Sequence, residues 1–207
     1  MNNVNKNKTV AMFGSSRTPR TSYLWSNVVQ AAEYMTQRGW TVATGGGSGL
    51  MQAAMSGAIE GGKMWLAKHT PEEDHPLVSG LTYSDHMQPS SLMLPRTASE
   101  LEAETYYTRL DTMLDCDAFI AMSGGYGTLL ELVQVCQAIQ MKRIPRKPLY
   151  VCGKSLNNTF QRFMHDCRVG DYIDADEIFH TYVDYPTEAA TNLCALKQFV
   201  EIPDYLR

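Results

Sequence analysis

Several features that mark other classes of protein are missing from this sequence of 207 residues. No apolar run approaches the roughly 18 residues of a membrane-spanning helix, so we expect no contact with a membrane. The first residues are polar and basic, so we expect a frayed tail over residues 1–8 and no signal peptide. A formal net charge of −4 disfavours binding to nucleic acid, which requires a basic surface. These absences predict a cytoplasmic globular protein and leave small anions open as ligands, because backbone N–H groups bind anions without net charge.

Metal-binding and disulfide patterns are also missing. The five histidines form no H-x-x-x-H pair, so we expect no metal site. The five cysteines are widely spaced and contain no C-x-x-C pair, which is typical of reduced thiols in a cytosolic protein. These cysteines are Cys116, Cys136, Cys152, Cys167 and Cys194.

The sequence does contain a regular alternation of apolar strands and amphipathic helices, within a length typical of one domain, which we place over residues 1–207. This alternation predicts an α/β fold, a three-layer sandwich with a mostly parallel sheet covered on both faces. The proline-containing segment His69–Arg96 is expected to be irregular, with one short strand. The expected strands are Thr9–Phe13, Trp40–Ala43, Met64–Ala67, Ala118–Met122, Leu149–Cys152 and Ile178–Val183, and the expected helices are Ser22–Arg38, Gly49–Glu60, Ala98–Asp115, Leu129–Ile139, Leu156–Arg168 and one that begins at Pro186.

The strongest candidate binding segment is Ser123–Glu131, which reads S-G-G-Y-G-T-L-L-E and follows an expected strand. Its glycines allow a ligand to approach the backbone, and the helix that begins here offers free N–H groups and a positive dipole end to a phosphate. An ordinary strand–turn–helix corner, with Glu131 as an acid favoured by the helix dipole, stays open as the alternative. The expected ligand contacts in this segment are Gly124, Gly125, Tyr126, Gly127 and Thr128.

Two further segments rich in glycine and serine follow expected strands. Gly45, Gly46 and Gly47 come after the second strand and suggest close approach of backbone to a ligand, although a plain loop is the alternative. Ser15, Ser16 and Arg17 follow the first strand and offer hydroxyls and a cation. Because carboxyl ends of parallel strands share one edge of a sheet, all three segments are expected at one ligand-binding edge.

Two familiar nucleotide-binding fingerprints are absent. The dinucleotide motif G-x-G-x-x-G fails because its sixth position is Leu50 when counted from Gly45 and Leu130 when counted from Gly125. The phosphate-binding motif G-x-x-x-x-G-K-[ST] does not occur, which excludes P-loop ATPase chemistry.

The segment S-G-G-Y-G-T-L-L-E resembles the P-G-G-x-G-T-x-x-E signature of the LOG (Lonely Guy) proteins, long mislabelled as lysine decarboxylases. T-G-G-G-S-G-L-M-Q-A-A resembles their first glycine motif, and M-F-G-S-S-R-T resembles their opening strand and turn. The resemblance extends from Thr9 to Lys147, about two-thirds of the chain. It implies a Rossmann-like fold, a homodimer or higher homo-oligomer, and hydrolysis of nucleoside 5′-monophosphates. The substrates would be AMP or cytokinin riboside monophosphates, cleaved to free base and ribose 5-phosphate with no cofactor.

The resemblance also implies a catalytic pair, which falls on Arg109 and Glu131 in this sequence. Two departures from the family pattern bear on this pair. Ser123 replaces the proline of the signature, and Arg109 lies one residue closer to the signature than is usual in the family. Because one residue turns a helical side chain by about 100°, either an irregularity in the helix compensates or Arg109 is displaced, with Arg96 as the substitute cation.

Two other functions stay open from the sequence. Proteins of the same fold carry molybdenum cofactor or bind nucleotides without cleaving them, and the two departures would suit such a non-catalytic protein. A pyridoxal-phosphate-dependent lysine decarboxylase is disfavoured because the glycine-rich segments contain no lysine to hold the aldehyde. The identity of the base is not predicted, since it is expected to depend on His69–Arg96, where His86 and Met93 are the candidate lining residues.

Overall fold

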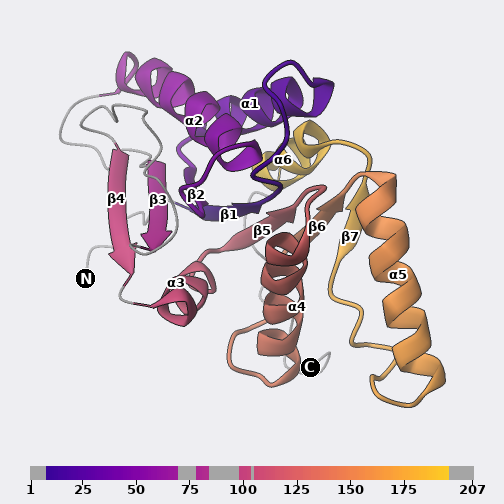
Figure 1. The fold of residues 1–207 in the computed structure, drawn as a ribbon. Helices are drawn as coiled ribbons and strands as arrows, with labels where there is room; N and C mark the ends of the chain where they lie inside the picture. Colours follow the sequence, from indigo (N-terminus) through magenta and orange to yellow (C-terminus); the bar gives the residue numbers. More distant parts are fainter. Residues whose placement is uncertain (1–7, 70–77, 84–97, 104, 196–207) are drawn as a thin grey trace.

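A computed structural model describes residues 8–69, 78–83, 98–103 and 105–195 (Figure 1). Seven strands form one sheet in the order β4-β3-β2-β1-β5-β6-β7, and every neighbouring pair is parallel. The predicted α/β fold with a parallel sheet is therefore confirmed. The strands are β1 (Thr9–Phe13), β2 (Thr41–Thr44), β3 (Val78–Tyr83), β4 (Ala98–Ala103), β5 (Ala118–Ala121), β6 (Leu149–Cys152) and β7 (Thr181–Val183). The helices are α1 (Tyr23–Thr36), α2 (Leu50–Leu66), α3 (Tyr106–Met113), α4 (Tyr126–Gln140), α5 (Lys154–Val169) and α6 (Pro186–Ala195).

The strand order reverses at β1, the centre of the sheet. The chain adds β2, β3 and β4 on one side of β1 and then returns to add β5, β6 and β7 on the other side. Val10 of β1 pairs with both Val42 of β2 and Ala118 of β5. In open parallel sheets, ligands bind beyond the carboxyl ends of the strands at such a reversal. The topology therefore predicts a ligand site in the loops after β1, β2 and β5.

Helices cover both faces of the sheet, as the alternating pattern predicted. Val10 and Met12 of β1 belong to the core beneath α1, α2 and α6. Ala11 and Phe13 belong to the core beneath α3, α4 and α5. Successive strand residues point to opposite faces, which is why one short apolar strand contributes to both cores.

The expected end of the second helix at Gly61 is wrong, and so is the strand expected at Met64–Ala67. α2 continues to Leu66, because its glycines serve packing against α1 rather than helix termination. A Cβ atom on Gly57 would lie 2.0 Å from the carbonyl oxygen of Val29 in α1, and a Cβ on Gly61 would lie 2.4 Å from that of Glu33. These contacts explain the glycines, and tertiary packing outweighs their low helix propensity.

The helix expected over Ala98–Asp115 is two elements. Its first residues form β4, which pairs with β3 along all six positions, and α3 begins only at Tyr106. Thr105 starts α3 by accepting a hydrogen bond on Oγ1 from the backbone N–H of Thr108 at 3.0 Å. Sheet pairing overrides a segment whose Ala, Glu and Leu residues favour helix.

The remaining expectations agree to within a few residues or fall outside the described ranges. β3 is the short strand expected within His69–Arg96, and the last expected strand is shortened to Thr181–Val183. His86, Met93 and the frayed tail lie outside the described residues, and the single-domain assignment stays a prediction. Among the described helices, none is long and apolar enough to cross a bilayer.

Candidate active site at the carboxyl edge of the sheet

Three loops meet at the carboxyl ends of β1, β2 and β5, as the sequence predicted (Figure 1). The backbone N–H of Ser15 donates to the carbonyl of Ser123 at 3.1 Å, which ties the loop after β1 to the loop after β5. The carbonyl of Ser15 accepts from the N–H of Leu50 at 2.8 Å, and Ser48 Oγ donates to the carbonyl of Ser16 at 2.8 Å. These bonds hold the loop after β1 between the other two loops.

Close approach of the three loops depends on two glycines. Gly49 has φ +64°, and a Cβ there would lie 2.2 Å from the carbonyl oxygen of Ser15. A Cβ on Gly124 would lie 2.1 Å from Thr128 Oγ1 and 3.1 Å from the backbone nitrogen of Ser15. Any other residue at these positions would separate the loops. These glycines therefore serve contacts within the protein.

The amino end of α4 is open, in contrast to the packed loops beneath it. Gly125 is the N-cap residue and supplies no side-chain cap to the first N–H groups of the helix. A Cβ on Gly125 or Gly127 would meet no atom within 4 Å, and Tyr126 between them is 95% exposed. Thr128 is buried, which places its hydroxyl beneath this exposed turn. Free N–H groups and the positive end of the helix dipole can bind an anion here.

Arg109 and Glu131 form a buried ion pair between α3 and α4. Arg109 Nη2 lies 3.3 Å from Glu131 Oε1, and the two residues are 4% and 7% exposed. Burial raises the pKa of the Glu131 carboxyl to about 7, against the opposing effect of the Arg109 charge, which lowers it. A carboxyl with such a pKa can accept or release a proton near neutral pH.

The shorter spacing before the signature does not prevent this contact. α3 ends at Met113, and Leu114 to Asp117 form the turn that leads into β5. Arg109 lies four residues before the end of α3 and reaches Glu131 of α4. Of the two alternatives, displacement of Arg109 away from Glu131 does not occur, and Arg96, the substitute cation, lies outside the described residues.

Gly45 makes room for the guanidinium of Arg109, a role that the sequence did not reveal. A Cβ on Gly45 would lie 1.9 Å from Arg109 Nη2 and 2.9 Å from Met51 Sδ. The adjacent Gly46 has φ +72°, and its N–H donates to Thr44 Oγ1 at 3.1 Å. Gly45, Gly46 and Gly47 are all buried, so contact between a substrate and this segment stays a prediction. The sequence shows a glycine immediately after a buried strand. It does not show which side chain packs against that glycine.

The other predicted ligand residues lie on the surface near these loops. Ser15 is partly buried, and its Oγ accepts a hydrogen bond from the N–H of Arg17 at 3.0 Å. Ser16 and Arg17 are exposed. The structure brings Ser15 against the loop of Ser123, whereas contact of Ser16 and Arg17 with a ligand stays a prediction.

Comparison with known proteins supports the family resemblance that the motifs indicate. A family model described as "Possible lysine decarboxylase" matches residues 51–193. Two curated proteins of Oryza sativa subsp. japonica are similar, both named as probable cytokinin riboside 5′-monophosphate phosphoribohydrolases. LOGL5 is 30% identical over 138 residues, covering 66% of this chain and 50% of the relative. LOGL3 is 30% identical over 149 residues, covering 69% of this chain and 61% of the relative. The chain thus spans between half and two-thirds of the length of these relatives.

Solved structures show the same fold at low sequence identity. A molybdenum cofactor (Moco) carrier protein from Chlamydomonas reinhardtii aligns with a TM-score of 0.58 and 16% identity, covering 93% of this chain and 100% of that protein. DNA processing protein A from Helicobacter pylori aligns with a TM-score of 0.55 and 15% identity, covering 92% of this chain and 81% of that protein. At these identities, the likeness concerns the Rossmann-like fold alone.

Proposed function

The chain belongs to the LOG family, and on that premise we propose that it is a hydrolase of nucleoside 5′-monophosphates. It cleaves the N-glycosidic bond of AMP or of a cytokinin riboside 5′-monophosphate and releases the free base and ribose 5-phosphate. The observation that carries this proposal is the buried ion pair between Arg109 and Glu131 at the edge of the sheet where α/β proteins bind ligands.

The phosphate of the substrate binds at the amino end of α4. Gly124, Gly125, Tyr126 and Gly127 present an exposed backbone there, and Thr128 offers its hydroxyl. This arrangement needs no positively charged side chain, which suits a chain with a net charge of −4. Binding energy from the phosphate then holds the sugar in place for reaction.

Glu131 acts on the ribose. Cleavage of a glycosidic bond passes through an oxocarbenium-like state with positive charge on the sugar, which a carboxylate stabilises. Glu131 is ionised above its pKa of about 7 and can then also accept the proton of the attacking water. The water oxygen bonds to the anomeric carbon, and the electrons of the broken C–N bond leave with the base, which takes up a proton.

Arg109 orients the carboxylate of Glu131 and lowers its pKa. Its guanidinium, 3.3 Å from the carboxylate, favours the ionised form and fixes its direction. Gly45 admits the guanidinium to this position, so we assign Gly45 to the site through Arg109. The reaction as written requires no metal or organic cofactor.

The description "possible lysine decarboxylase" does not suit the lysines after α4. Lys147 Nζ donates to the carbonyl oxygens of Leu114 and Cys116, both at 2.8 Å, and so anchors the turn before β5. Lys142 closes α4 with φ +56° and lies at the opposite end of that helix from the glycine-rich loop. These positions favour structural roles for both lysines.

We also propose that the protein is a homodimer or higher homo-oligomer in the cytoplasm. Exposed apolar side chains on α3, on α4 and directly after α4 support self-association, because large apolar groups on a surface favour contact with another protein. They include Tyr107, Leu130 and Met141, which are 76%, 44% and 64% exposed. Measurement of the solution mass by light scattering tests this assignment.

Product analysis tests the proposed reaction. The protein is incubated with AMP, with N6-isopentenyladenosine 5′-monophosphate and with adenosine, and free base is measured by liquid chromatography. We expect base and ribose 5-phosphate from at least one monophosphate and much slower release from adenosine, which lacks the phosphate. Calorimetric binding of AMP without release of base would select the non-catalytic carrier instead.

A further inference from the structure

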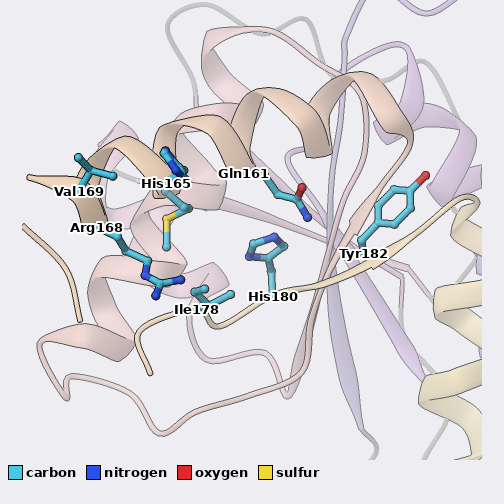
Figure 2. A pocket seen from close by; sticks show the side chains of 8 residues that line it. Gln161, His165, Arg168, Val169, Ile178, His180 and Tyr182 are labelled. Atoms are coloured by element: carbon cyan, nitrogen blue, oxygen red, sulfur yellow. The ribbon is translucent and has the colours of Figure 1, made fainter. Parts of the chain in front are cut away.

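A pocket of about 570 Å³ lies between α5 and the edge of the sheet, away from the candidate active site (Figure 2). A volume of this size is in the range of small-molecule sites. Five side chains of α5 and three of the extended segment that ends in β7 line it. They are Gln161, Met164, His165, Arg168 and Val169 on α5, with Ile178, His180 and Tyr182 facing them.

The sequence spacing explains why these residues share one pocket. Gln161, Met164 and Arg168 are three and four residues apart, so they lie on one face of α5. Ile178, His180 and Tyr182 alternate along an extended backbone and lie on one side of it. Figure 2 shows Gln161 and Arg168 reaching from the helix toward His180 and Ile178.

The pocket lies at the other end of the sheet from the candidate active site. α5 begins after β6 at the carboxyl edge and runs back, so that Arg168 near its end approaches the amino ends of the strands. Glu131 and the amino end of α4 lie at the carboxyl edge. A ligand in this pocket would therefore occupy a separate site.

The polar groups of the pocket differ in their partners. Tyr182 Oη donates to Asp184 Oδ1, and His165 Nδ1 lies 3.4 Å from Asp166 Oδ1. The Nδ1 atom of His180 is buried and forms no hydrogen bond. The guanidinium of Arg168 and the amide of Gln161 form no ion pair or side-chain hydrogen bond with any described residue. Gln161 and Arg168 are exposed at the pocket, so a ligand there can contact both side chains, whereas the buried Nδ1 atom of His180 cannot be reached from the pocket.

The pocket also has a rigid apolar side. Met164 is buried in the core beneath α5, and Ile178 packs against the same core. The ring of His180 stands against Phe160 with centroids 5.0 Å apart, which fixes the imidazole in place. Burial lowers the pKa of His180, so its ring is neutral at neutral pH and adds no charge to the site.

We propose that this pocket is a second ligand site, which binds a small monocarboxylic acid with an apolar body. The carboxylate pairs with Arg168, and the apolar body packs on Met164 and Ile178 beside the ring of His180. One guanidinium matches the single charge of a carboxylate in a two-pronged geometry. Arg146, the neighbouring cation on this side of the sheet, is engaged elsewhere because its Nη2 donates to the carbonyl of Ile178 at 3.0 Å.

Calorimetric titration of the full chain with benzoate tests the proposal, with benzamide as the neutral isostere and phenyl phosphate as the alternative anion. We expect saturable binding of benzoate with a dissociation constant on the order of 1 mM, as suits a ligand of this size, and binding of benzamide at least about tenfold weaker. Arg168→Gln should weaken benzoate about tenfold, whereas Arg162→Gln, an exposed arginine of α5 outside the pocket, should leave it unchanged.

Any of four results would overturn the proposal. Absence of saturable benzoate binding means that the pocket is not a carboxylate site. Equal affinity of the wild type and Arg168→Gln means that benzoate binds elsewhere. Tighter binding of phenyl phosphate than of benzoate, lost in Arg168→Gln, means that the pocket is a phosphate site. Addition of AMP should not displace benzoate, and competition between them would place benzoate in the candidate active site.

Discussion

The guanidinium of Arg109 and the carboxylate of Glu131 lie 3.3 Å apart in the protein interior, one on α3 and the other on α4. Neither helix fixes this contact alone. Asp111 of α3 accepts on Oδ1 from Gln134 Nε2 of α4 at 3.4 Å and from Arg143 Nη2, in the turn after α4, at 3.3 Å. Gly45 leaves the space that the guanidinium occupies. The ion pair therefore depends on three segments that the fold assembles at one edge of the sheet.

Activity should depend on pH through Glu131. The carboxyl has a pKa raised to about 7, so the ionised form that we propose as active increases as pH rises through that value. We expect kcat/KM for AMP to rise about tenfold per pH unit below the pKa and to level off above it. A flat profile between pH 5 and pH 8 would contradict the assignment of Glu131 to proton transfer.

Replacing Arg109 should move this pH profile upward. The charge of Arg109 lowers the pKa of Glu131, so Arg109→Gln removes that effect and raises the pKa further. At neutral pH the variant should lose activity at least about a hundredfold, and part of the loss should return at higher pH. The profile of kcat/KM against pH is the measurement. Arg162→Gln is the control, because Arg162 is an exposed arginine on α5 and forms no contact with the ion pair.

Stability should change with pH because of the same carboxyl. The pKa of Glu131 is higher in the folded protein than its usual 4.5, so the folded state holds the proton more tightly than the unfolded state. Raising the pH from about 5 to above 7 therefore lowers the free energy of unfolding, by on the order of 2 kcal/mol from this group. Glu131→Gln cannot titrate and should lose this component. Denaturant unfolding of both proteins at pH 5 and pH 8 measures the difference, and equal pH dependence would contradict it.

Substitution of Gly45 should lower activity, because it displaces the guanidinium of Arg109. The Cβ of Gly45→Ala would lie 1.9 Å from Arg109 Nη2, so the guanidinium must move away from its place beside Glu131. We expect at least about a tenfold loss of kcat, together with an upward shift of the pH profile like that of Arg109→Gln. A change in stability without a shift of the pH profile would show that Gly45 has only a packing role.

Gly127→Ala should weaken substrate binding without lowering the stability of the protein. A Cβ at this position meets no protein atom within 4 Å, and the residue lies in the first turn of α4, where alanine favours helix. We expect an unfolding free energy that is unchanged or raised by up to about 1 kcal/mol. The added methyl group stands where the phosphate is proposed to bind, so KM for AMP should rise severalfold. An unaltered KM would place the phosphate elsewhere.

The motifs predicted the position of the three site loops better than they predicted the helices and strands between these loops. Apolar strands that end in glycine-rich turns placed the three loops at one edge, because parallel strands share that edge. Ala98–Ala103 was misread as helix, since its Ala, Glu and Leu residues favour helix until pairing with β3 forces them to extend. Gly61 was misread as a helix end, since nothing in the local sequence shows that α1 lies against it.

Contacts between residues that are distant in the sequence could not be predicted from the sequence. The residue spacing suggested that Arg109 could be displaced, but spacing counts residues across a turn and does not give the direction of a side chain. The role of Gly45 depends on a side chain more than sixty positions away. The pocket beside His180 joins two segments that carry no motif. In each case the missing information is which surfaces pack together.

The most direct test of the central claim is the release of free base from AMP, or from N6-isopentenyladenosine 5′-monophosphate, by the wild type and by Glu131→Gln. Glutamine keeps the size of the side chain but cannot accept the proton, so the variant should bind AMP in a calorimeter while base release falls at least about a thousandfold. Base release by Glu131→Gln at the wild-type rate, or no base release from any monophosphate by the wild type, would contradict the account.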